Sequence, residues 1–322
     1  GRTFNMSFKI IGTGSYLPDF VVTNDDLSNM VDTSDEWIMQ RIGIKERHIS
    51  KKESTAEMGY KAALSALQMS GTKPEEIDLI IAASMTGDTI CPTTAGLVGN
   101  FLGTECPAFD INSACSGFVF ALDTAAGFFA RGKAKKALVI GSERISKIVD
   151  WKDRATCVIF GDGAGAAVLS EGDSYLCSKL FTSGGDDVIK IPSGADSSPY
   201  YEKETETGHI FMEGQETFKF AVNTMVSDIK YLLETTKTSA DELKYIVPHQ
   251  ANVRIIDYAA KRLKIPQEKF FVNIESCGNT SAASIAIALD ELNRKNTLKN
   301  GDKLILTAFG GGLSSASCII KW

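Results

Sequence analysis

The sequence predicts an α/β protein built from two similar halves. Short runs rich in Val, Ile and Leu alternate with longer stretches of helical periodicity, which is typical of layered α/β folds. The same order of elements recurs about 165 positions later. At 322 residues, with 43% hydrophobic and 23% charged residues, the chain is long enough for two units that share a substantial core.

The first copy begins with β-prone runs at 78–83 and 108–112. An almost wholly apolar stretch at 115–130 predicts a buried helix, and a further strand is expected at 137–141. The apolar stretch is interrupted by Asp123, and nothing in the chain approaches the roughly 18 uninterrupted apolar residues of a membrane span. We therefore expect no membrane association.

The second copy repeats this order of strand, strand, helix and strand. Its expected strands are at 243–247, 270–274 and 303–307, and its expected helix is at 280–293. At this spacing Cys115 in the first copy is aligned with Asn279 in the second. Two copies of one unit are expected to face each other.

The expected domain boundary lies near residue 172. We predict an N-terminal half at 6–172 and a C-terminal half at 173–322, with residues 1–5 as a non-native remnant before a natural start at Met6. The segment 171–207 is rich in Gly, Ser, Asp and Pro and is the expected connector between the halves. A helix at 214–235 should follow, with Phe218, Val222, Met225 and Ile229 on its buried face.

Each half ends in a glycine-containing β pattern, GDGAGAAVLS at 161–170 and FGGGLSSASCIIK at 309–321. The first lacks the G-x-G-x-x-G spacing and the following helix that a dinucleotide-binding loop requires. A hairpin whose glycines permit positive φ or close backbone approach is the better interpretation.

Composition excludes several function classes. A net charge of −6 argues against general nucleic-acid binding, which depends on clustered Lys and Arg. Seven scattered cysteines without C-x-x-C spacing indicate reduced thiols, and with no secretory signal the expected compartment is the cytoplasm. The three histidines form no metal-binding pattern, so no metal is expected.

Cys115, His249 and Asn279 are the candidate reactive residues, because each lies where a strand gives way to a helix. Ligands of α/β sheets gather at the carboxyl ends of strands, and a helix N-terminus favours a thiolate. Taken singly, a packed cysteine, a structural histidine and an asparagine cap are the simpler interpretations. Together they favour one site, whereas His48 and His209 keep a structural interpretation.

These residue types are compatible with three alternative functions. A thiolate can attack a thioester, a neutral histidine and an amide can donate to an enolate oxygen, and backbone N–H groups can hold an oxyanion. Carbon–carbon bond formation by thioester chemistry would use every part. A Cys-His-Asn hydrolase of thioesters or amides is the second alternative, and a non-catalytic binding protein is the third.

The motifs around these residues resemble the thiolase superfamily, and specifically the β-ketoacyl-acyl-carrier-protein synthase III family. The resemblance covers nearly the whole chain and includes IGTGSYLP, DTSDEWI, SACSGF, ERIS, FGDGAGAAVL, PHQAN, ESCGNTSAAS and AFGGGLSSAS. It implies a thiolase-like fold of duplicated α/β halves in five αβαβα layers. It also implies an initiating condensing enzyme of fatty-acid synthesis, although a paralogue of specialised metabolism is left open.

The resemblance further implies roles for the reactive residues. Cys115 would take the acyl group of an acyl-CoA primer, which is a substrate, so no cofactor is expected. His249 and Asn279 would stabilise the enolate formed when malonyl-acyl-carrier protein loses CO2. The N–H groups of Cys115 and Gly311 would form the oxyanion hole, and the product would be a β-ketoacyl-carrier protein.

Binding roles are carried over from the resemblance in the same way. The expected CoA contacts are Trp37, Arg41, Arg154 and Asn252. The expected docking positions for the acidic carrier protein are Lys219, Arg254, Lys261 and Arg262. Cys91 takes the place of a side chain that closes the partner subunit's acyl pocket in relatives, which implies a homodimer and room for primers larger than acetyl.

Overall fold

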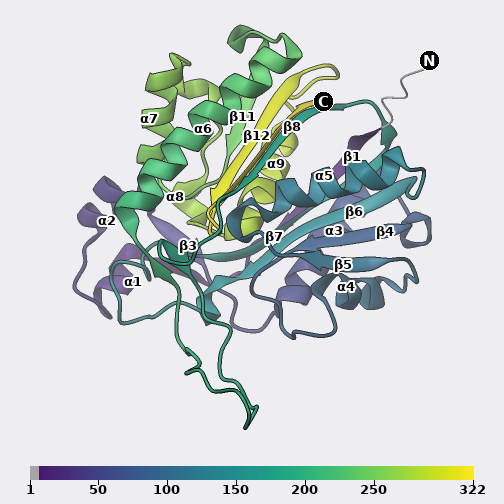
Figure 1. Cartoon of the computed structure of the whole chain (residues 1–322). Coiled ribbons are helices and arrows are strands. Elements are labelled where there is room, and N and C mark those ends of the chain that lie inside the picture. Colours follow the sequence, from purple (N-terminus) through teal and green to yellow (C-terminus); the bar gives the residue numbers. More distant parts are fainter. Residues whose placement is uncertain (1–6) are drawn as a thin grey trace.

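The computed structural model describes residues 7–322 and has five layers, in which two mixed sheets alternate with three layers of helices (Figure 1). The predicted α/β class and the duplicated, layered architecture are confirmed. The remnant expected at 1–5 and the start expected at Met6 lie outside the described residues.

The first sheet has five strands in the order β1-β7-β6-β4-β5. They are β1 (Ser7–Tyr16), β7 (Asp162–Gly172), β6 (Lys136–Arg144), β4 (Leu79–Ala83) and β5 (Ala108–Ile111). Strands β6, β4 and β5 are parallel to one another, whereas β7 runs antiparallel to both β6 and β1. The parallel strands thus end at one common edge.

The second sheet repeats this plan with four strands in the order β11-β12-β13-β8. They are β11 (Leu243–Pro248), β12 (Lys303–Gly310), β13 (Ser314–Lys321) and β8 (Tyr175–Thr182). Strands β11 and β12 are parallel, and the other pairs are antiparallel. A single parallel bridge between Ile246 and Phe270 stands where the first sheet has β5.

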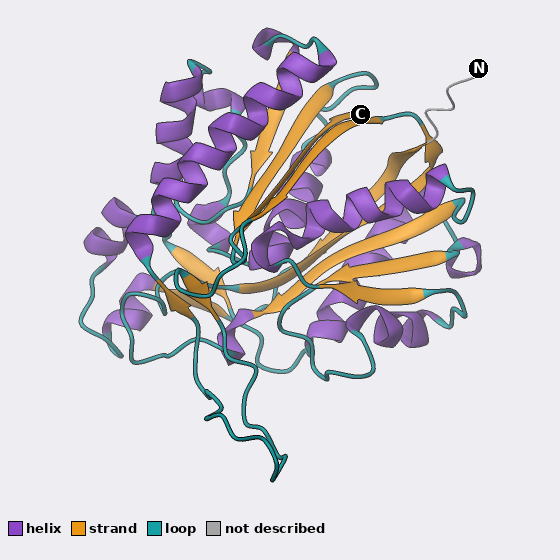
Figure 2. Cartoon of the chain, in the orientation of Figure 1, coloured by secondary structure: helices purple, strands orange, loops and turns teal. Residues whose placement is uncertain are grey.

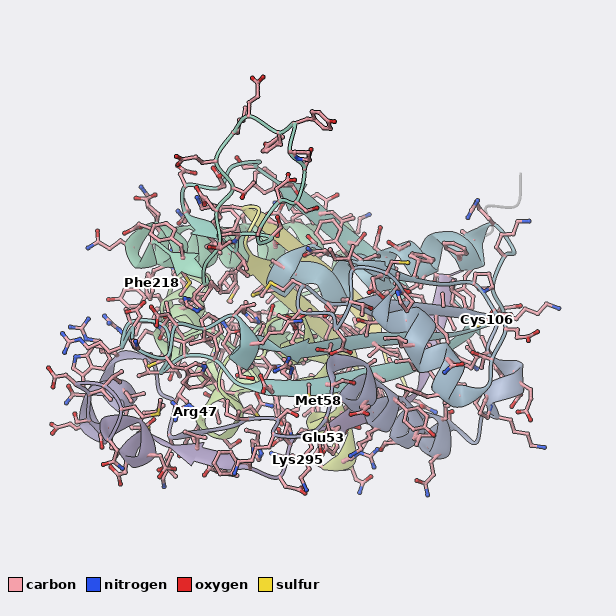
Figure 3. All side chains as sticks on the ribbon, turned by 90° about the horizontal axis from the view of Figure 1, so that it is seen from below. Arg47, Glu53, Met58, Cys106, Phe218 and Lys295 are labelled. Atoms are coloured by element: carbon pink, nitrogen blue, oxygen red, sulfur yellow. The ribbon has the colours of Figure 1, made fainter. Side chains whose placement is uncertain are left out.

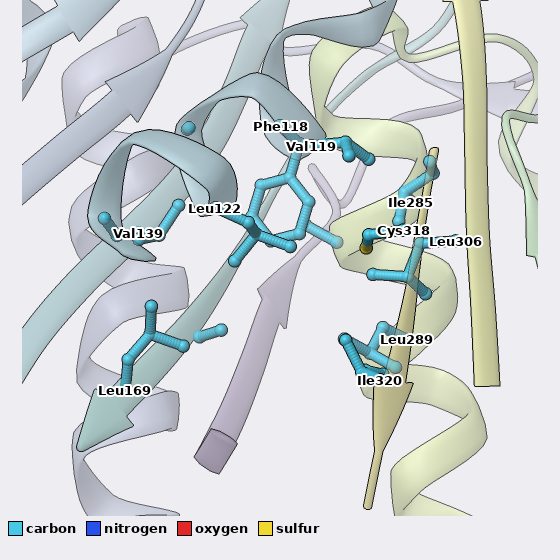
Figure 4. Close-up of a cluster of buried hydrophobic side chains, with 14 of the residues drawn as sticks. Phe118, Val119, Leu122, Val139, Leu169, Ile285, Leu289, Leu306, Cys318 and Ile320 are labelled. Atoms are coloured by element: carbon cyan, nitrogen blue, oxygen red, sulfur yellow. The ribbon is translucent and has the colours of Figure 1, made fainter. Parts of the chain in front are cut away.

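The middle layer consists of helices α5 (Gly117–Ala130) and α9 (Ser284–Arg294). Their apolar residues are buried between the two sheets, which is why α5 has almost no polar face. Phe118 and Leu122 of α5 meet Ile285 and Leu289 of α9 in this core (Figure 4). The middle layer thereby joins the two halves.

Outer helices cover the remaining face of each sheet. Helices α3 (Thr55–Ser70) and α4 (Thr94–Leu102) pack on the first sheet, and α6 (Gly214–Thr236) and α7 (Val253–Leu263) pack on the second. On α6, Val222, Met225 and Ile229 are buried as predicted, and Phe218 is partly buried beside them. Each of these helices therefore presents one apolar face to its sheet.

Short elements complete the structure, which Figure 2 shows by secondary-structure type. The strands are β2 (Val21–Thr23), β3 (Glu46–His48), β9 (Ile189–Lys190) and β10 (Phe211–Met212). The helices are α1 (Asn24–Ser28), α2 (Asp35–Arg41) and α8 (Ile274–Cys277). The 3-10 turns are η1 (Pro74–Glu76), η2 (Ala114–Ser116), η3 (Ile145–Lys147), η4 (Ala240–Glu242), η5 (Gln267–Lys269) and η6 (Ser281–Ala283). Within residues 7–322, no helix is long and apolar enough to cross a membrane.

Two expected elements differ in the structure. The predicted connector at 171–207 is wrong in its first part, because β8 lies there and pairs with β13; the long excursion begins after β9 and projects from the body (Figure 1). The strand expected at 270–274 is reduced to the bridge at Phe270, since α8 begins at Ile274. The domain division at 172 stays a prediction, and β7 ends at that residue.

The glycines of the GDGAG motif lie in or beside β7, and none of them has positive φ. They permit close approach instead. A Cβ on Gly165 would come within 2.5 Å of the backbone of Ala286, so the absence of a side chain lets α9 pack directly on β7. The close-approach part of the sequence interpretation is therefore correct.

Candidate active site

Cys115, His249 and Asn279 line one cavity of about 1010 Å³. Cys115 follows the end of β5, and His249 follows the end of β11. Figure 3 shows Phe218, which also lines the cavity, at the end of the molecule opposite Cys106, a residue just before the start of β5. The cavity therefore lies at the carboxyl ends of the parallel strands, where α/β sheets usually bind ligands.

Cys115 occupies the strained turn η2, directly before α5. Ala114, the first residue of that turn, has φ of 47° in the left-handed region, and the Ser116 hydroxyl donates to the Ser113 carbonyl at 2.8 Å. Ala114 and Cys115 of this turn both line the cavity. Loss of bulk water around the sulfur raises the pKa of Cys115 to about 12, so the resting group is a protonated thiol.

The structure corrects the alignment between the two copies. Turn η6 opens on Ser281 with φ of 53° and leads into α9, just as η2 opens on Ala114 and leads into α5. Cys115 therefore corresponds to Ala282, and Asn279 corresponds to Asn112. The predicted pairing of Cys115 with Asn279 is wrong because the second copy has an added helix, α8, between the Phe270 bridge and η6, whereas no helix separates β5 from η2 in the first.

His249 is held by its backbone and by an aromatic neighbour. Its N–H donates to the Thr307 carbonyl at 2.8 Å, and its ring meets the Phe309 ring edge-on with centroids 5.2 Å apart. Its Nδ1 atom is buried and has no hydrogen-bond partner among the described residues. Burial lowers the pKa of His249 to about 3, because the charged form loses its hydration. The imidazole is therefore neutral near pH 7.

Asn279 is fixed at both its backbone and its side chain. Its N–H donates to the Ile159 carbonyl at 2.9 Å, and its own carbonyl accepts from the Gly161 N–H at 3.0 Å. Its Oδ1 accepts from the Ser281 N–H at 2.8 Å. Because Oδ1 is engaged, Nδ2 is the side-chain atom left to donate to a ligand in the cavity.

Gly310 and Gly311 pass directly beside the nucleophile. A Cβ on Gly310 would come within 2.8 Å of the Cys115 nitrogen, and one on Gly311 would lie 3.5 Å from the Cβ of Ala114. Gly311 also lines the cavity together with Cys115. Backbone from the C-terminal half thus lies directly beside the nucleophile of the N-terminal half.

The structure brings three of the expected CoA residues together, Trp37, Arg41 and Arg154, but none of them is among the cavity-lining residues within 7–322. Two guanidinium groups lie near the Trp37 ring, that of Arg41 at 5.0 Å and that of Arg154 at 5.7 Å from its centroid. Arg154 also forms an ion pair with Asp32 at 3.3 Å. Asn252 lines the cavity and caps α7, where its Oδ1 accepts from the Arg254 N–H. These groups offer an aromatic face and two cations, and Arg41 directly precedes Ile42 of the cavity lining.

The expected docking residues are exposed on α6 and α7, and we call them the basic patch: Lys219, Arg254, Lys261 and Arg262. The Arg254 guanidinium carbon lies 6.0 Å from the Phe218 ring centroid, and Phe218 lines the cavity. Arg262 donates to the Asn223 Oδ1 of α6 at 2.6 Å. The basic patch therefore begins at the cavity and extends along α7.

Cys91 is exposed in this chain. Its neighbours Thr89 and Ile90 line the cavity, but Cys91 is not among the lining residues within 7–322. Ile90 is fully exposed, at 102% of its reference area. A single chain thus leaves this segment uncovered beside the cavity.

Sequence reasoning missed three residues around the triplet Cys115, His249 and Asn279. Ser281 donates its hydroxyl to the Cys115 sulfur, and Phe309 contacts the His249 ring. Glu143 is fully buried, and burial raises its pKa to about 8. Ser281 could have been found from its position two residues after Asn279, and Glu143 and Phe309 lie in the motifs ERIS and AFGGGLSSAS, but nothing in those motifs indicates which cavity residue each would contact.

Family models match two segments of this chain, and known relatives match nearly its whole length. The family model described as 3-oxoacyl-[acyl-carrier-protein] synthase III matches residues 109–184, and the model of its C-terminal part matches residues 233–322. The β-ketoacyl-[acyl-carrier-protein] synthase III of Clostridium acetobutylicum is 50% identical over 321 residues, which cover 98% of this chain and 99% of that protein. The chain belongs to the synthase III family.

Solved structures of family members have the same fold as this synthase. The 3-oxoacyl-[acyl-carrier-protein] synthase III of Aquifex aeolicus VF5 superimposes with a TM-score of 0.92 at 46% identity, covering 98% of this chain and 100% of that one. The enzyme of Pseudomonas aeruginosa PAO1 gives 0.92 at 36% identity, covering 98% of each chain. The synthase described here is therefore an acyltransferase that carries out the initiating condensation of fatty-acid synthesis, and the alternatives of a hydrolase or a specialised paralogue are not favoured.

Proposed function

We propose that this synthase condenses an acyl-CoA primer with malonyl-acyl-carrier protein through an acyl-Cys115 intermediate. The observation that carries the proposal is the convergence of the thiol of Cys115, the neutral ring of His249 and the amide of Asn279 on one cavity. A carbonyl-attacking sulfur and two hydrogen-bond donors are the groups that thioester condensation needs.

The first half-reaction loads the primer. The Cys115 sulfur attacks the thioester carbon of the acyl-CoA, and the bond from that carbon to the CoA sulfur breaks. The N–H groups of Cys115 and Gly311 stabilise the oxyanion of the tetrahedral intermediate. The proton that leaves Cys115 ends on the CoA thiol, so the step balances without a cofactor.

The second half-reaction forms the carbon–carbon bond. The malonyl thioester loses CO2, and the electron pair of the broken bond forms an enolate whose oxygen accepts from His249 and Asn279. The enolate carbon attacks the acyl carbon on Cys115, the carbon–sulfur bond breaks, and the β-ketoacyl-carrier protein leaves. The electron pair of that bond stays on the Cys115 sulfur, which takes up a proton from solvent and returns to the thiol. A neutral His249 suits this role, because it donates from one ring nitrogen without requiring a charged form.

The residues beside the cavity are proposed to bind the two substrates. Trp37 and Arg154 stack on the adenine of CoA, Arg41 neutralises phosphate, and Asn252 contacts the pantetheine arm. The basic patch binds the acidic carrier protein, which brings the malonyl group to the cavity beside Phe218. The exposure of Lys219, Arg254, Lys261 and Arg262 and the contact of Arg254 with Phe218 support this arrangement.

We infer a homodimer in the cytoplasm, with the segment around Cys91 facing the partner's acyl pocket. The full exposure of Ile90 in the single chain supports a partner over this segment, because a large apolar side chain favours burial. The thiol of Cys91 occupies less volume than the side chain, often Phe, that relatives have at this position. The proposed primers are accordingly branched or medium-chain acyl groups as well as acetyl.

Mass spectrometry of the intact protein after exposure to a panel of acyl-CoAs tests the function. We expect an acyl adduct on Cys115 that clears only when malonyl-acyl-carrier protein is added, and Cys115→Ala should form none. Clearance by water alone would support a hydrolase, and the absence of any adduct on the folded wild-type protein would support a binding protein.

A further inference from the structure

Ser281 contacts both sides of the active site through different atoms. Its hydroxyl donates to the Cys115 sulfur at 3.2 Å, and its backbone N–H donates to the Asn279 Oδ1 at 2.8 Å. Ser281 belongs to the C-terminal copy, whereas Cys115 belongs to the N-terminal copy. One buried residue, only 1% exposed, therefore links the nucleophile to the amide that faces the cavity.

The backbone of Ser281 explains why both contacts are possible at once. Its φ of 53° lies in the left-handed region, which turns the N–H back toward Asn279 while the side chain points at the neighbouring turn η2. Such a conformation costs a non-glycine residue roughly 1 kcal/mol or more. The cost is offset by the surrounding packing, in which Ala282 and Ala283 are also buried.

The Ser281 hydroxyl stabilises the thiolate form of Cys115 against its electrostatic surroundings. Burial and the carboxyl of Glu143 both disfavour a thiolate at Cys115, while the Ser281 hydroxyl favours one. His249, the histidine among the cavity-lining residues within 7–322, is held neutral by burial and supplies no positive charge in the resting enzyme. The hydroxyl is thus the side-chain donor that the sulfur has among the described residues.

We propose that Ser281 is a positioning residue that serves the two half-reactions separately, with its hydroxyl supporting attack by the Cys115 sulfur and its N–H orienting Asn279 for decarboxylation. The inference rests on the proposed function. During loading, the sulfur forms its bond to the acyl carbon as the bond to the CoA sulfur breaks, and the proton of the thiol passes to CoA. Once the sulfur is acylated it carries no charge, so the hydroxyl contributes little to the loss of CO2 from the malonyl group.

The test separates the hydroxyl from the N–H. Ser281→Ala removes the hydroxyl and keeps the N–H, and Ser281→Gly does the same with a residue that adopts positive φ without strain. Ser284→Ala is the matched control, because that buried hydroxyl bonds to Thr280 in the same segment and not to the sulfur. Circular dichroism and thermal melts establish whether each variant is folded. If Ser281→Ala does not fold, the rates of Ser281→Gly alone test the role of the hydroxyl.

Two rates are measured on each folded variant. Alkylation of Cys115 by iodoacetamide between pH 6 and 10 reports the reactivity of the sulfur without any natural substrate. CO2 release from malonyl-acyl-carrier protein, in a Cys115→Ala background, reports decarboxylation. Loss of one hydrogen bond to a developing anion should slow alkylation and acyl-CoA loading at pH 7 by roughly three- to tenfold and shift the alkylation profile to higher pH. CO2 release should stay within about twofold.

Three results would overturn the proposal: alkylation unchanged in both Ser281 variants, an equal loss in both rates, or an equal loss of alkylation in Ser284→Ala. Failure of the proposed function would look different. In that case wild-type Cys115 would not be acylated by any acyl-CoA, yet its alkylation would still depend on Ser281. The two failures are therefore distinguishable in one set of experiments.

Discussion

Gly310 lies so close to Cys115 that a Cβ on the glycine would come within 2.8 Å of the cysteine nitrogen. The contact joins the end of β12 in one half to turn η2 in the other. The atoms involved are the backbone nitrogen of Cys115 and a Cβ attached directly to the Gly310 backbone, so a side-chain rotation could not relieve the clash. The nucleophile is thus positioned by a glycine from the opposite half of the chain.

The first prediction concerns this contact. Gly310→Ala should displace turn η2 and lower the free energy of unfolding by about 1–3 kcal/mol, because the added methyl group overpacks a dense interior. Acylation of Cys115 should fall by about 100-fold, since its sulfur and N–H leave their productive positions. Intact mass spectrometry measures the loading rate, and thermal melts measure stability.

Gly127→Ala is the matched control for that prediction. Gly127 lies within α5, and a Cβ there would meet nothing within 4 Å. Replacing this helical glycine should leave loading unchanged and raise stability by roughly 0.5–1 kcal/mol. Normal loading by Gly310→Ala would show that the close approach does not position Cys115.

The second prediction concerns the neutral state of His249. Its folded pKa of about 3 lies below the unfolded value of 6.5, so the folded imidazole stays uncharged as pH falls through 6.5. CO2 release by Cys115→Ala should therefore change by less than about twofold between pH 5 and 7. His249→Ala should reduce the rate by about 100-fold. A titration limb with its midpoint near 6.5 would contradict the prediction.

The third prediction concerns stability and the buried carboxyl of Glu143. Its Oε1 accepts from the Met85 N–H at 2.6 Å, and burial raises its pKa from 4.5 to about 8. The folded state therefore binds more protons than the unfolded state between these values, so this contribution to stability is present at low pH and is lost as pH rises through 8. The slope should reach about 1.4 kcal/mol per pH unit at most.

Glu143→Gln checks that sign. The amide resembles the protonated acid and does not titrate, so urea unfolding of the variant should lose this falling slope between pH 5 and 8. At pH 8 the variant should be at least as stable as the wild type. The prediction would be contradicted if the free energy of unfolding of the wild type rose between pH 5 and 8 while that of Glu143→Gln stayed constant. That result would mean that folding favours the ionised form of Glu143.

The fourth prediction concerns the basic patch. Arg254→Glu reverses a charge beside Phe218 and should raise KM for malonyl-acyl-carrier protein by about tenfold, with a smaller effect at high salt. Loading from acyl-CoA should stay within about twofold. Lys133→Glu, at an exposed position after α5, is the matched control and should leave KM unchanged. An unaltered KM in Arg254→Glu would remove this patch from carrier-protein docking.

The fifth prediction concerns primer size. Steady-state rates across a series of acyl-CoAs should show branched four- and five-carbon primers within about tenfold of acetyl-CoA. Cys91→Phe should reduce use of the larger primers by at least about tenfold and spare acetyl-CoA, because the ring fills the partner's pocket. Cys91→Ala keeps a small side chain and should behave like the wild type. A strict acetyl preference in the wild type would refute the interpretation.

Local sequence was sufficient for much of the fold. The apolar residues of α5 predict a helix buried on all sides, and the spacing of Val222, Met225 and Ile229 predicts the buried face of α6, since helical periodicity places such residues on one stripe. Local sequence failed at β8, because the Gly, Ser and Asp residues around this strand are typical of a connector. It also failed at 270–274, because the apolar residues there form an isolated bridge and the start of a short helix instead of a strand. Strand pairing there depends on distant partners.

The sequence by itself determined the residue types of the site and their positions after strands, which is why Cys115, His249 and Asn279 could be named in advance. Only the tertiary structure decided how they are held. Left-handed turns at Ala114 and Ser281 set the true alignment of the copies, and Gly310 and Ser281 reach Cys115 from the opposite half. These contacts join residues far apart in the chain, and no local propensity or periodicity encodes such a distance; it arises only when both halves pack around the shared middle layer.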